Sequence, residues 1–131
     1  MSMVWSGIPE FNLAIDGMVE AANVATREAV AKGAAKIQVK ARDRSPVAHG
    51  ANKRSIQVKG PIGAGVLGYM ATIAPEMIYS RRLELGFSGT DALGRAYHEQ
   101  PHPYLAPGLA DATPELAEIF RAAWAAATSG I

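Results

Sequence analysis

One apolar pattern with helical spacing runs through the first third of the chain and constrains any fold that this sequence can adopt. Pro9 suits a first helical turn, and the Ser45-Pro46 step ends a helix because the residue before a proline leaves the α region. Between these signals, apolar or small residues recur at spacings of three and four and predict one long helix from Pro9 to Arg44. Its two adjacent stripes are Phe11, Ile15, Met18, Ala22, Ala25 and Ala29, and Val19, Thr26, Val30, Gly33 and Ile37.

A helix of that length is longer than a compact domain built from this chain. It would span about 54 Å, whereas a compact chain of 131 residues has a diameter of roughly 36 Å. Gly17 and Gly33 are the two points where the helix could bend. We expect either such a bend or, in preference, copies of the same chain that cover the apolar end of the helix.

The supply of large apolar side chains is small. Hydrophobic residues make up 49% of the chain, but 25 residues are alanine, so we expect a thin core. The absence of cysteine excludes disulfide scaffolds, cysteine-ligated metal sites and thiol catalysis. The first residues do not resemble a signal peptide, and no stretch approaches the ~20 apolar residues of a membrane span. These features indicate a single domain over residues 1–131, soluble and made inside the cell.

Positive charge is concentrated in one stretch, although the formal net charge of the whole chain is only +1. Between Lys32 and Lys59, eight basic residues accompany a single acidic residue, Asp43, whereas acidic residues outnumber basic ones after position 65. Two interpretations stay open: a solvated helix face with a basic turn, or a positive surface that faces nucleic acid or an acidic partner subunit. The candidate basic surface consists of Lys36, Lys40, Arg42, Arg44, Lys53 and Arg54.

The remaining patterns predict a hairpin, a short helix, a loop and a second helix. A turn over 46–52 leads to a strand over 55–59, whose antiparallel partner is 66–74. A short helix follows over 76–85, and residues 86–101 form a long exposed loop or flexible hairpin. Thr113 is expected to cap the last helix, with Pro114 in its first turn. The predicted fold class is α+β.

Three groups of residues resemble catalytic or cofactor-binding motifs but lack the structural context that such motifs need. His98-Glu99-Gln100-Pro101-His102 matches the zincin string HExxH, yet Pro101 prevents the helix that would align the two histidines. The stretch from Gly63 to Gly68 matches GxGxxG, but it precedes β-forming residues instead of opening a helix. His49, between Ser45 and Ser55, has no orienting acid. The sequence therefore predicts no catalytic residue, metal site, cofactor or small-molecule substrate.

Three segments of the chain, in this order, resemble one protein family. The first runs from Ala34 through Ser45-Pro46-Val47-Ala48-His49-Gly50 to Ser55-Ile56, and the second from Tyr79 to Glu84-Leu85-Gly86. The third is His102-Pro103-Tyr104-Leu105-Ala106-Pro107-Gly108-Leu109. Together they are similar to the tail-completion, or head–tail joining (neck), proteins of long-tailed bacteriophages and prophages. The departures are His49 in place of threonine, Asn52 near a usual leucine, and Gly108 in place of alanine. The candidate motif or interface residues are Ser45, Pro46, Val47, Gly50, Ser55, Ile56, Tyr79, Glu84, Gly86, Pro103, Tyr104 and Pro107.

The resemblance implies a structural virion protein and not an enzyme. Members of this family form a ring, commonly a hexamer, between head-completion (stopper) proteins and the tail-tube or tail-terminator protein, around the path of the DNA. It implies self-association, no membrane, and a place in the virion neck after synthesis in the host bacterial cytoplasm. We also expect the 86–101 loop to become ordered only on docking to the tail or to adjacent subunits. The alternative function is a small nucleic-acid-binding module that uses the basic surface.

Overall fold

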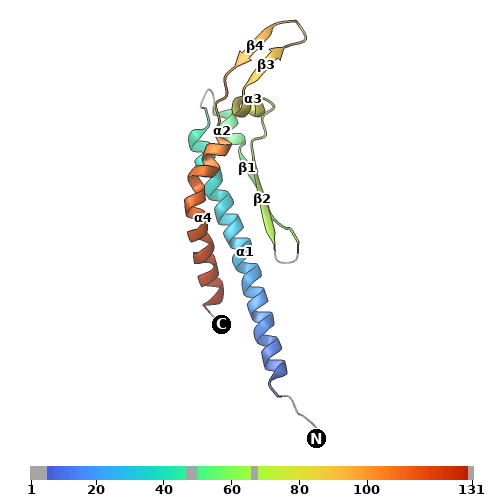
Figure 1. The fold of residues 1–131 in the computed structure, drawn as a ribbon, viewed down its shortest axis with the longest axis vertical. Helices are drawn as coiled ribbons and strands as arrows, with labels where there is room; N and C mark the ends of the chain where they lie inside the picture. Colours follow the sequence, from blue (N-terminus) through green and yellow to red (C-terminus); the bar gives the residue numbers. More distant parts are fainter. Residues whose placement is uncertain (1–5, 47–49, 66–67, 130–131) are drawn as a thin grey trace.

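Helix α1, over Ile8–Arg44, runs through most of the length of the molecule (Figure 1). The computed structural model describes residues 6–46, 50–65 and 68–129, and in it α1 continues as one helix through Gly17 and Gly33. Pro9 lies in the first turn, where its missing N–H costs nothing. Ser45 follows the last turn with extended backbone angles, φ −67° and ψ 135°. The long helix predicted from the apolar pattern is confirmed, and neither glycine interrupts it.

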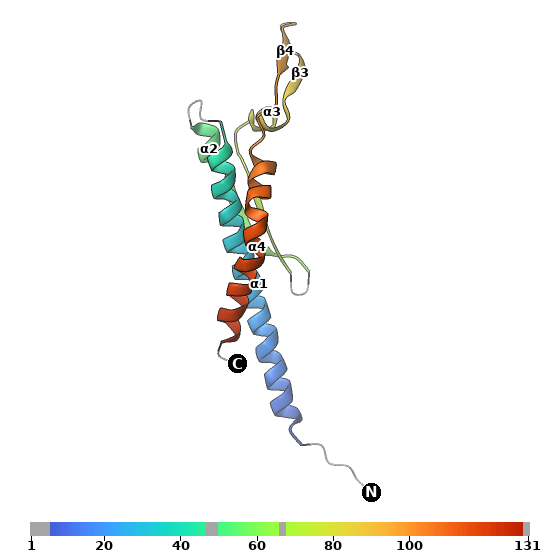
Figure 2. The ribbon, with the colours of Figure 1, turned by 60° about the vertical axis from the view of Figure 1, so that its left-hand side comes forward.

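Within the described ranges, two antiparallel hairpins and three further helices complete an α+β fold, as the sequence predicts. The first hairpin lies beside α1, and the second projects from the end of the molecule opposite the amino terminus (Figures 1 and 2). The first pairs β1 (Gln57–Gly63) with β2 (Tyr69–Ala74), and the second pairs β3 (Phe87–Thr90) with β4 (Ala96–Glu99). The other helices are α2 (Ala51–Ser55), α3 (Ser80–Leu85) and α4 (Leu105–Thr128).

The interface between α1 and α4 is built from alanine and glycine. Gly108 of α4 lies against Ala41 of α1 so closely that a Cβ atom on Gly108 would be 2.7 Å from the Ala41 nitrogen. At Gly33 of α1, a Cβ atom would be 3.2 Å from the side chain of Leu116. Small side chains let the helix backbones approach closely but remove little apolar area from water. The thin core predicted from composition follows: the buried alanines are Ala21, Ala25, Ala29, Ala34, Ala41, Ala112 and Ala123.

The amino-terminal part of α1 extends beyond the carboxyl end of α4 in both ribbon views (Figures 1 and 2). Every residue from position 6 to position 20 is exposed. The helix itself spans about 55 Å, so the overhang expected from its length is present in this single chain. The large apolar residues exposed along it are Ile8, Phe11, Leu13, Ile15, Met18 and Val19.

Several predicted boundaries around the first hairpin are wrong. The segment 51–55, predicted to end a turn and begin a strand, is the short helix α2, and Gly50 precedes it with a left-handed φ of 69°. The following strand begins at Gln57, and the short helix α3 begins at Ser80, later than the expected start at residue 76. Propensity places strands and helices better than their ends, because capping and packing partners decide the ends.

The start of the last helix was predicted too late in the chain. Thr113 and Pro114 lie inside α4, which begins at Leu105, and the Thr113 hydroxyl donates to the Leu109 carbonyl one turn earlier. A proline inside a helix removes one backbone hydrogen bond. Packing of α4 along α1 outweighs that loss. The helix therefore begins at Leu105, and Thr113 does not act as its amino-terminal cap.

Residues 86–101, expected as an irregular loop or flexible hairpin, contain the regular hairpin β3–β4. At its turn the Asp91 carboxylate accepts hydrogen bonds from the backbone N–H groups of Leu93 and Arg95 and from the Tyr97 hydroxyl. The Arg95 backbone N–H is foremost among the donors that hold the pKa of Asp91 below its ordinary value. The Phe87 ring packs near Tyr97 at the other end, with the Arg82 guanidinium 3.9 Å above its centroid. The hairpin thus has its own stabilising contacts, and the expectation that it orders only on docking stays a prediction.

Gly108→Ala tests the close helix contact. The added methyl group meets the backbone of Ala41, which cannot move aside as a flexible side chain would. We expect a loss of roughly 1–3 kcal/mol in the free energy of unfolding, measured by urea titration with circular dichroism. The matched control is Gly17→Ala, because Gly17 is helical and a methyl group there would meet nothing within 4 Å. That control should gain about 0.5–1 kcal/mol, and equal effects at the two glycines would contradict the close contact.

Candidate functional site

Most of the described motif residues lie together at one end of the molecule, where α1 ends and α2, α3 and α4 meet. The centre is a small apolar cluster of Ala41, Ile56 and Tyr104, each with no exposed surface. Ile56 and Tyr104 are the largest fully buried side chains in the described part of the chain. Partly buried Ile73, Leu83 and Leu105 pack against this cluster. Two motif segments that are far apart in sequence, around Ile56 and around Tyr104, thus share one core.

A buried polar group, Asn52, joins four elements beside this cluster. Its amide nitrogen donates to the Ser45 hydroxyl over 3.1 Å, and its amide oxygen accepts from the Ser80 hydroxyl. The Tyr104 hydroxyl lies 3.5 Å from the same amide oxygen. All four residues are buried, so each needs these partners in place of water. The sequence around Asn52 does not indicate this role, because the hydrogen-bond partners of Asn52 come from distant segments.

Glu84 caps the amino terminus of α4. Its carboxylate accepts hydrogen bonds from the backbone N–H groups of Tyr104, Leu105 and Ala106, at 2.7, 3.0 and 3.1 Å. The next residue, Pro107, has no N–H, and Gly108 begins the helical ladder by donating to the Tyr104 carbonyl. Every N–H of the first turn therefore has a partner. Partial burial of Glu84 acts to raise its pKa, but the three N–H donors together outweigh it and hold the pKa below its ordinary value.

The remaining motif residues serve this end of the fold in separate ways. The Ser55 hydroxyl donates to the Asn52 carbonyl and accepts from the Glu76 N–H. Gly86, with a φ of 73°, approaches β4 so closely that a Cβ atom would be 2.7 Å from the Glu99 oxygen. Tyr79 and Pro103 are exposed, and Val47 lies outside the described residues. Pro46, Gly50 and Pro107 are half-buried.

The candidate basic surface is partly neutralised within the chain. Arg44 makes two hydrogen bonds to Asp111 on α4, which hold the pKa of that carboxyl below its usual range, and Lys36 pairs with Glu115 at 3.4 Å. Arg42 turns toward the fold and donates to the Ile56 carbonyl. Only part of the local positive charge thus faces solvent without an acidic neighbour. Within this candidate basic surface, all of whose residues the structure describes, Lys40, Arg42, Lys53 and Arg54 have no carboxylate oxygen within 4.0 Å.

The HExxH string has the non-helical structure that the sequence predicts. His98 and Glu99 lie in β4 and His102 follows it, so no helix aligns the two histidines. In the described ranges no group of three or more His, Asp or Glu side chains is placed to hold a metal ion. Of the GxGxxG glycines, Gly63 ends β1, while Gly65 and Gly68 lie in the connection to β2, whose residues 66 and 67 are outside the described part. His49 lies outside it as well.

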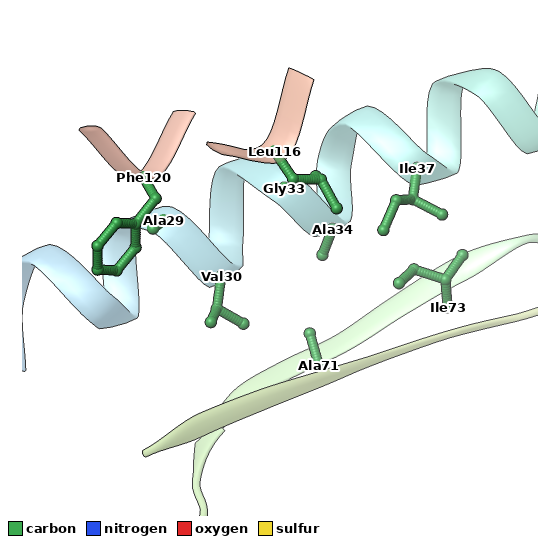
Figure 3. Close-up of a pocket in the computed structure, with 9 residues that line it drawn as sticks. All are labelled: Ala29, Val30, Gly33, Ala34, Ile37, Ala71, Ile73, Leu116 and Phe120. Carbon is green, nitrogen blue, oxygen red and sulfur yellow. The ribbon is translucent and has the colours of Figure 1, made fainter. Parts of the chain in front are cut away.

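An apolar groove runs between α1, α4 and β2 (Figure 3). Val30 and Ile37 of α1 point toward Ala71 and Ile73 of β2, while Leu116 and Phe120 approach from α4. No titratable side chain lines this groove. It can bury apolar groups, but it offers no acid, base or nucleophile for chemistry. The groove is one apolar surface that the small core of this chain does not cover. The exposed amino-terminal end of α1, residues 8–20, is another.

No protein-family model, no curated protein and no solved structure matches this chain. Among the described residues, no helix is both long enough and apolar enough to pass through a lipid bilayer.

Glu84→Gln tests the cap on α4. The amide keeps one acceptor oxygen but loses the charge that favours three N–H donors, so we expect a loss of about 1 kcal/mol in the free energy of unfolding near neutral pH. Because the folded-state pKa of Glu84 is lowered, its contribution is full above the ordinary glutamate pKa and disappears as pH falls through the folded-state pKa. The difference between wild type and variant should therefore shrink in acid. Glu99→Gln, on an exposed strand position, is the control; a difference independent of pH would contradict the cap.

Asn52→Ala tests the buried polar group. The change leaves the hydroxyls of Ser45 and Ser80 buried without their partner, which costs about 1–3 kcal/mol. Thermal unfolding followed by circular dichroism measures the loss. Asn23→Ala, at a half-buried position of α1, is the matched control and should stay within about 0.5 kcal/mol of wild type. Equal stability of the two variants would show that Asn52 does not organise this end of the fold.

Proposed function

We propose that this chain is a structural virion protein of the head–tail interface, which assembles as a ring and joins the tail of a long-tailed phage to its DNA-filled head. The segments that resemble neck proteins support this, since residues around Ser45, Ile56, Glu84 and Tyr104 come together in one core. The partners proposed with it are copies of itself, a head-completion (stopper) protein, and a tail-tube or tail-terminator protein. DNA would pass through the ring.

The observation that carries the proposal is the bare amino-terminal end of α1. Leu13 is 71% exposed and Phe11 is 64% exposed, on a segment where every residue is exposed. Proteins that act as monomers rarely leave contiguous apolar patches of large size, and such patches mark interaction sites. A chain completed by its neighbours in an assembly accounts for an uncovered helix end of this kind.

The second hairpin offers a separate contact for the assembly. β3–β4 projects away from the helices at the end opposite the amino terminus (Figure 2), and Leu93 at its turn is 78% exposed. At this turn the Asp91 carboxylate accepts four hydrogen bonds, from Leu93, Arg95 and Tyr97. The projecting hairpin suits a contact with the head or tail protein that borders the ring.

The nucleic-acid-binding alternative has weaker support. Arg44 and Lys36 pair with acidic residues of α4, and Arg42 binds a backbone carbonyl. The basic stretch therefore presents less net charge to a phosphate backbone than its sequence suggests. A gel-shift assay with random duplex DNA at two salt concentrations distinguishes this alternative from the structural role. Tight binding by the isolated protein that falls steeply with salt would favour nucleic-acid binding.

An in vitro joining assay tests the proposed function. A phage from which this gene is deleted should accumulate filled heads and finished tails that stay separate in electron micrographs. Adding the purified protein to that lysate should restore infectious particles. Phe11→Ser/Leu13→Ser should lower the restored titre by at least about tenfold, since burial of each side chain contributes about 1.5–3 kcal/mol.

Val39→Ser is the matched control for this assay, because Val39 is also exposed on α1 but lies outside the overhanging segment. It should restore the titre as well as wild type does. Circular dichroism of both variants confirms that the fold is kept. Complete particles in the deletion lysate, or a purified protein that restores nothing, would contradict the proposal.

A further inference from the structure

The bare end of α1 is acidic as well as apolar. The residues Ile8–Glu20 include Glu10, Asp16 and Glu20 and no basic residue. No basic group lies within 4.0 Å of these three carboxylates in the described part of the chain. Successive residues of an α-helix are turned by about 100° around its axis. One arc of about 100° on the helix surface therefore holds most of the large apolar residues of this segment: Met18, Phe11, Ile15, Ile8 and Val19. On its Val19 side, Asp16 lies about 60° beyond the edge of that arc and Glu20 about 100° beyond it.

The opposite end of the molecule is basic and apolar. Lys53 and Arg54 of α2 and Arg81 and Arg82 of α3 have no carboxylate within 4.0 Å among the described residues. Ile78 there is fully exposed, and Leu85 is 64% exposed. A hollow of about 380 Å³ opens beside them, lined by Pro75, Met77, Ile78, Ser80, Arg81, Glu84, Leu85 and Leu105. Its one acid, Glu84, is engaged with the N–H groups of α4.

These two ends are complementary in charge, and both carry uncovered apolar side chains. The other candidate, the groove between α1, α4 and β2, has neighbours of mixed sign that pair with each other, such as Arg121 with Glu118 and Lys36 with Glu115. Contact between two α1 ends would place like charges together, which opposes association. The α2–α3 end of another copy is therefore the surface that best fits the bare end of α1.

We propose that the segment Ile8–Glu20 of one copy docks on the α2–α3 end of a second copy. The apolar arc around Phe11 covers Ile78, Leu85 and the hollow beside them, while Asp16 on the flank of the helix faces the basic side chains of α2 and α3, and Glu20 adds to the negative charge of the segment. The two surfaces lie at opposite ends of each chain (Figure 1), so the contact is heterologous: it repeats from copy to copy and closes into a ring when the rotation per copy allows. The inference rests on the proposed function for its setting, in which this contact is one that builds the ring.

A charge-exchange experiment on the purified full chain tests this contact. Asp16→Lys/Glu20→Lys reverses the acidic end, and Arg54→Glu/Arg81→Glu reverses exposed residues of the basic end. Sedimentation velocity at tens of micromolar protein and low salt should show association of wild type that weakens as salt rises. Each variant alone should associate at least about tenfold more weakly. A one-to-one mixture should recover association, because the reversed α1 end of one meets the reversed α2–α3 end of the other.

Further variants distinguish the proposed contact from other contacts between copies of the chain. Asp16→Asn/Glu20→Gln removes charge without reversing it, so it should weaken the proposed contact but strengthen pairing between two α1 ends; stronger association would overturn the proposal. Failure of the mixture to associate, or wild type that stays monomeric at every concentration, would also overturn it. Circular dichroism checks that each variant is folded. If a variant that does not associate keeps its joining activity, the contact is refuted and the proposed function stands. If the wild-type protein associates as expected but joins no heads to tails, the contact stands and the proposed function is refuted.

Discussion

The close contact between α1 and α4 is the constraint on which the rest of this fold depends. Gly108 lies against the backbone of Ala41, and Gly33 lies beneath Leu116, so the two helices approach to a distance that larger side chains would prevent. That approach is favourable for packing, but alanine and glycine remove little apolar surface from water. A fold held in this way cannot derive its stability from a large core. It needs either specific polar contacts or further surface contributed from outside the chain.

The polar contacts that organise the fold gather at one end. Glu84 binds three backbone N–H groups at the start of α4, and Asn52 connects hydroxyls from α3 and from the segments that follow α1 and precede α4. These interactions fix where four elements meet around Ile56 and Tyr104. Nothing comparable holds the first three turns of α1, whose residues are all exposed. The chain thus has one end determined by its own contacts and another whose apolar side chains the chain itself leaves uncovered.

How far the fold could be predicted follows from where each signal lies in the sequence. The pattern that defines α1 is local, so its bounds were predicted within one residue. The start of α4 depends on Glu84, twenty residues before Tyr104, and a nearer capping signal at Thr113 misled the prediction. The hairpin β3–β4 did have a local signal, since Asp91 followed by Gly94 is typical of a turn that an aspartate side chain stabilises. Asn52, and the pairing of Arg44 with Asp111, could not be predicted because each joins segments that only the fold brings together.

In the proposed assembly, the acidic residues on the overhanging end of α1 have a second role, in keeping free copies of the chain from aggregating. An exposed helix end with Phe11, Ile15 and Met18 on one face would pair readily with its own copies if it were uncharged. Asp16 and Glu20 make that pairing unfavourable, because two such ends bring carboxylates together without a base between them. The same carboxylates favour a surface that presents arginine and lysine around apolar side chains. In the proposed contact, the same residues therefore favour the right partner surface and disfavour the wrong one, and both effects weaken as salt screens the charges.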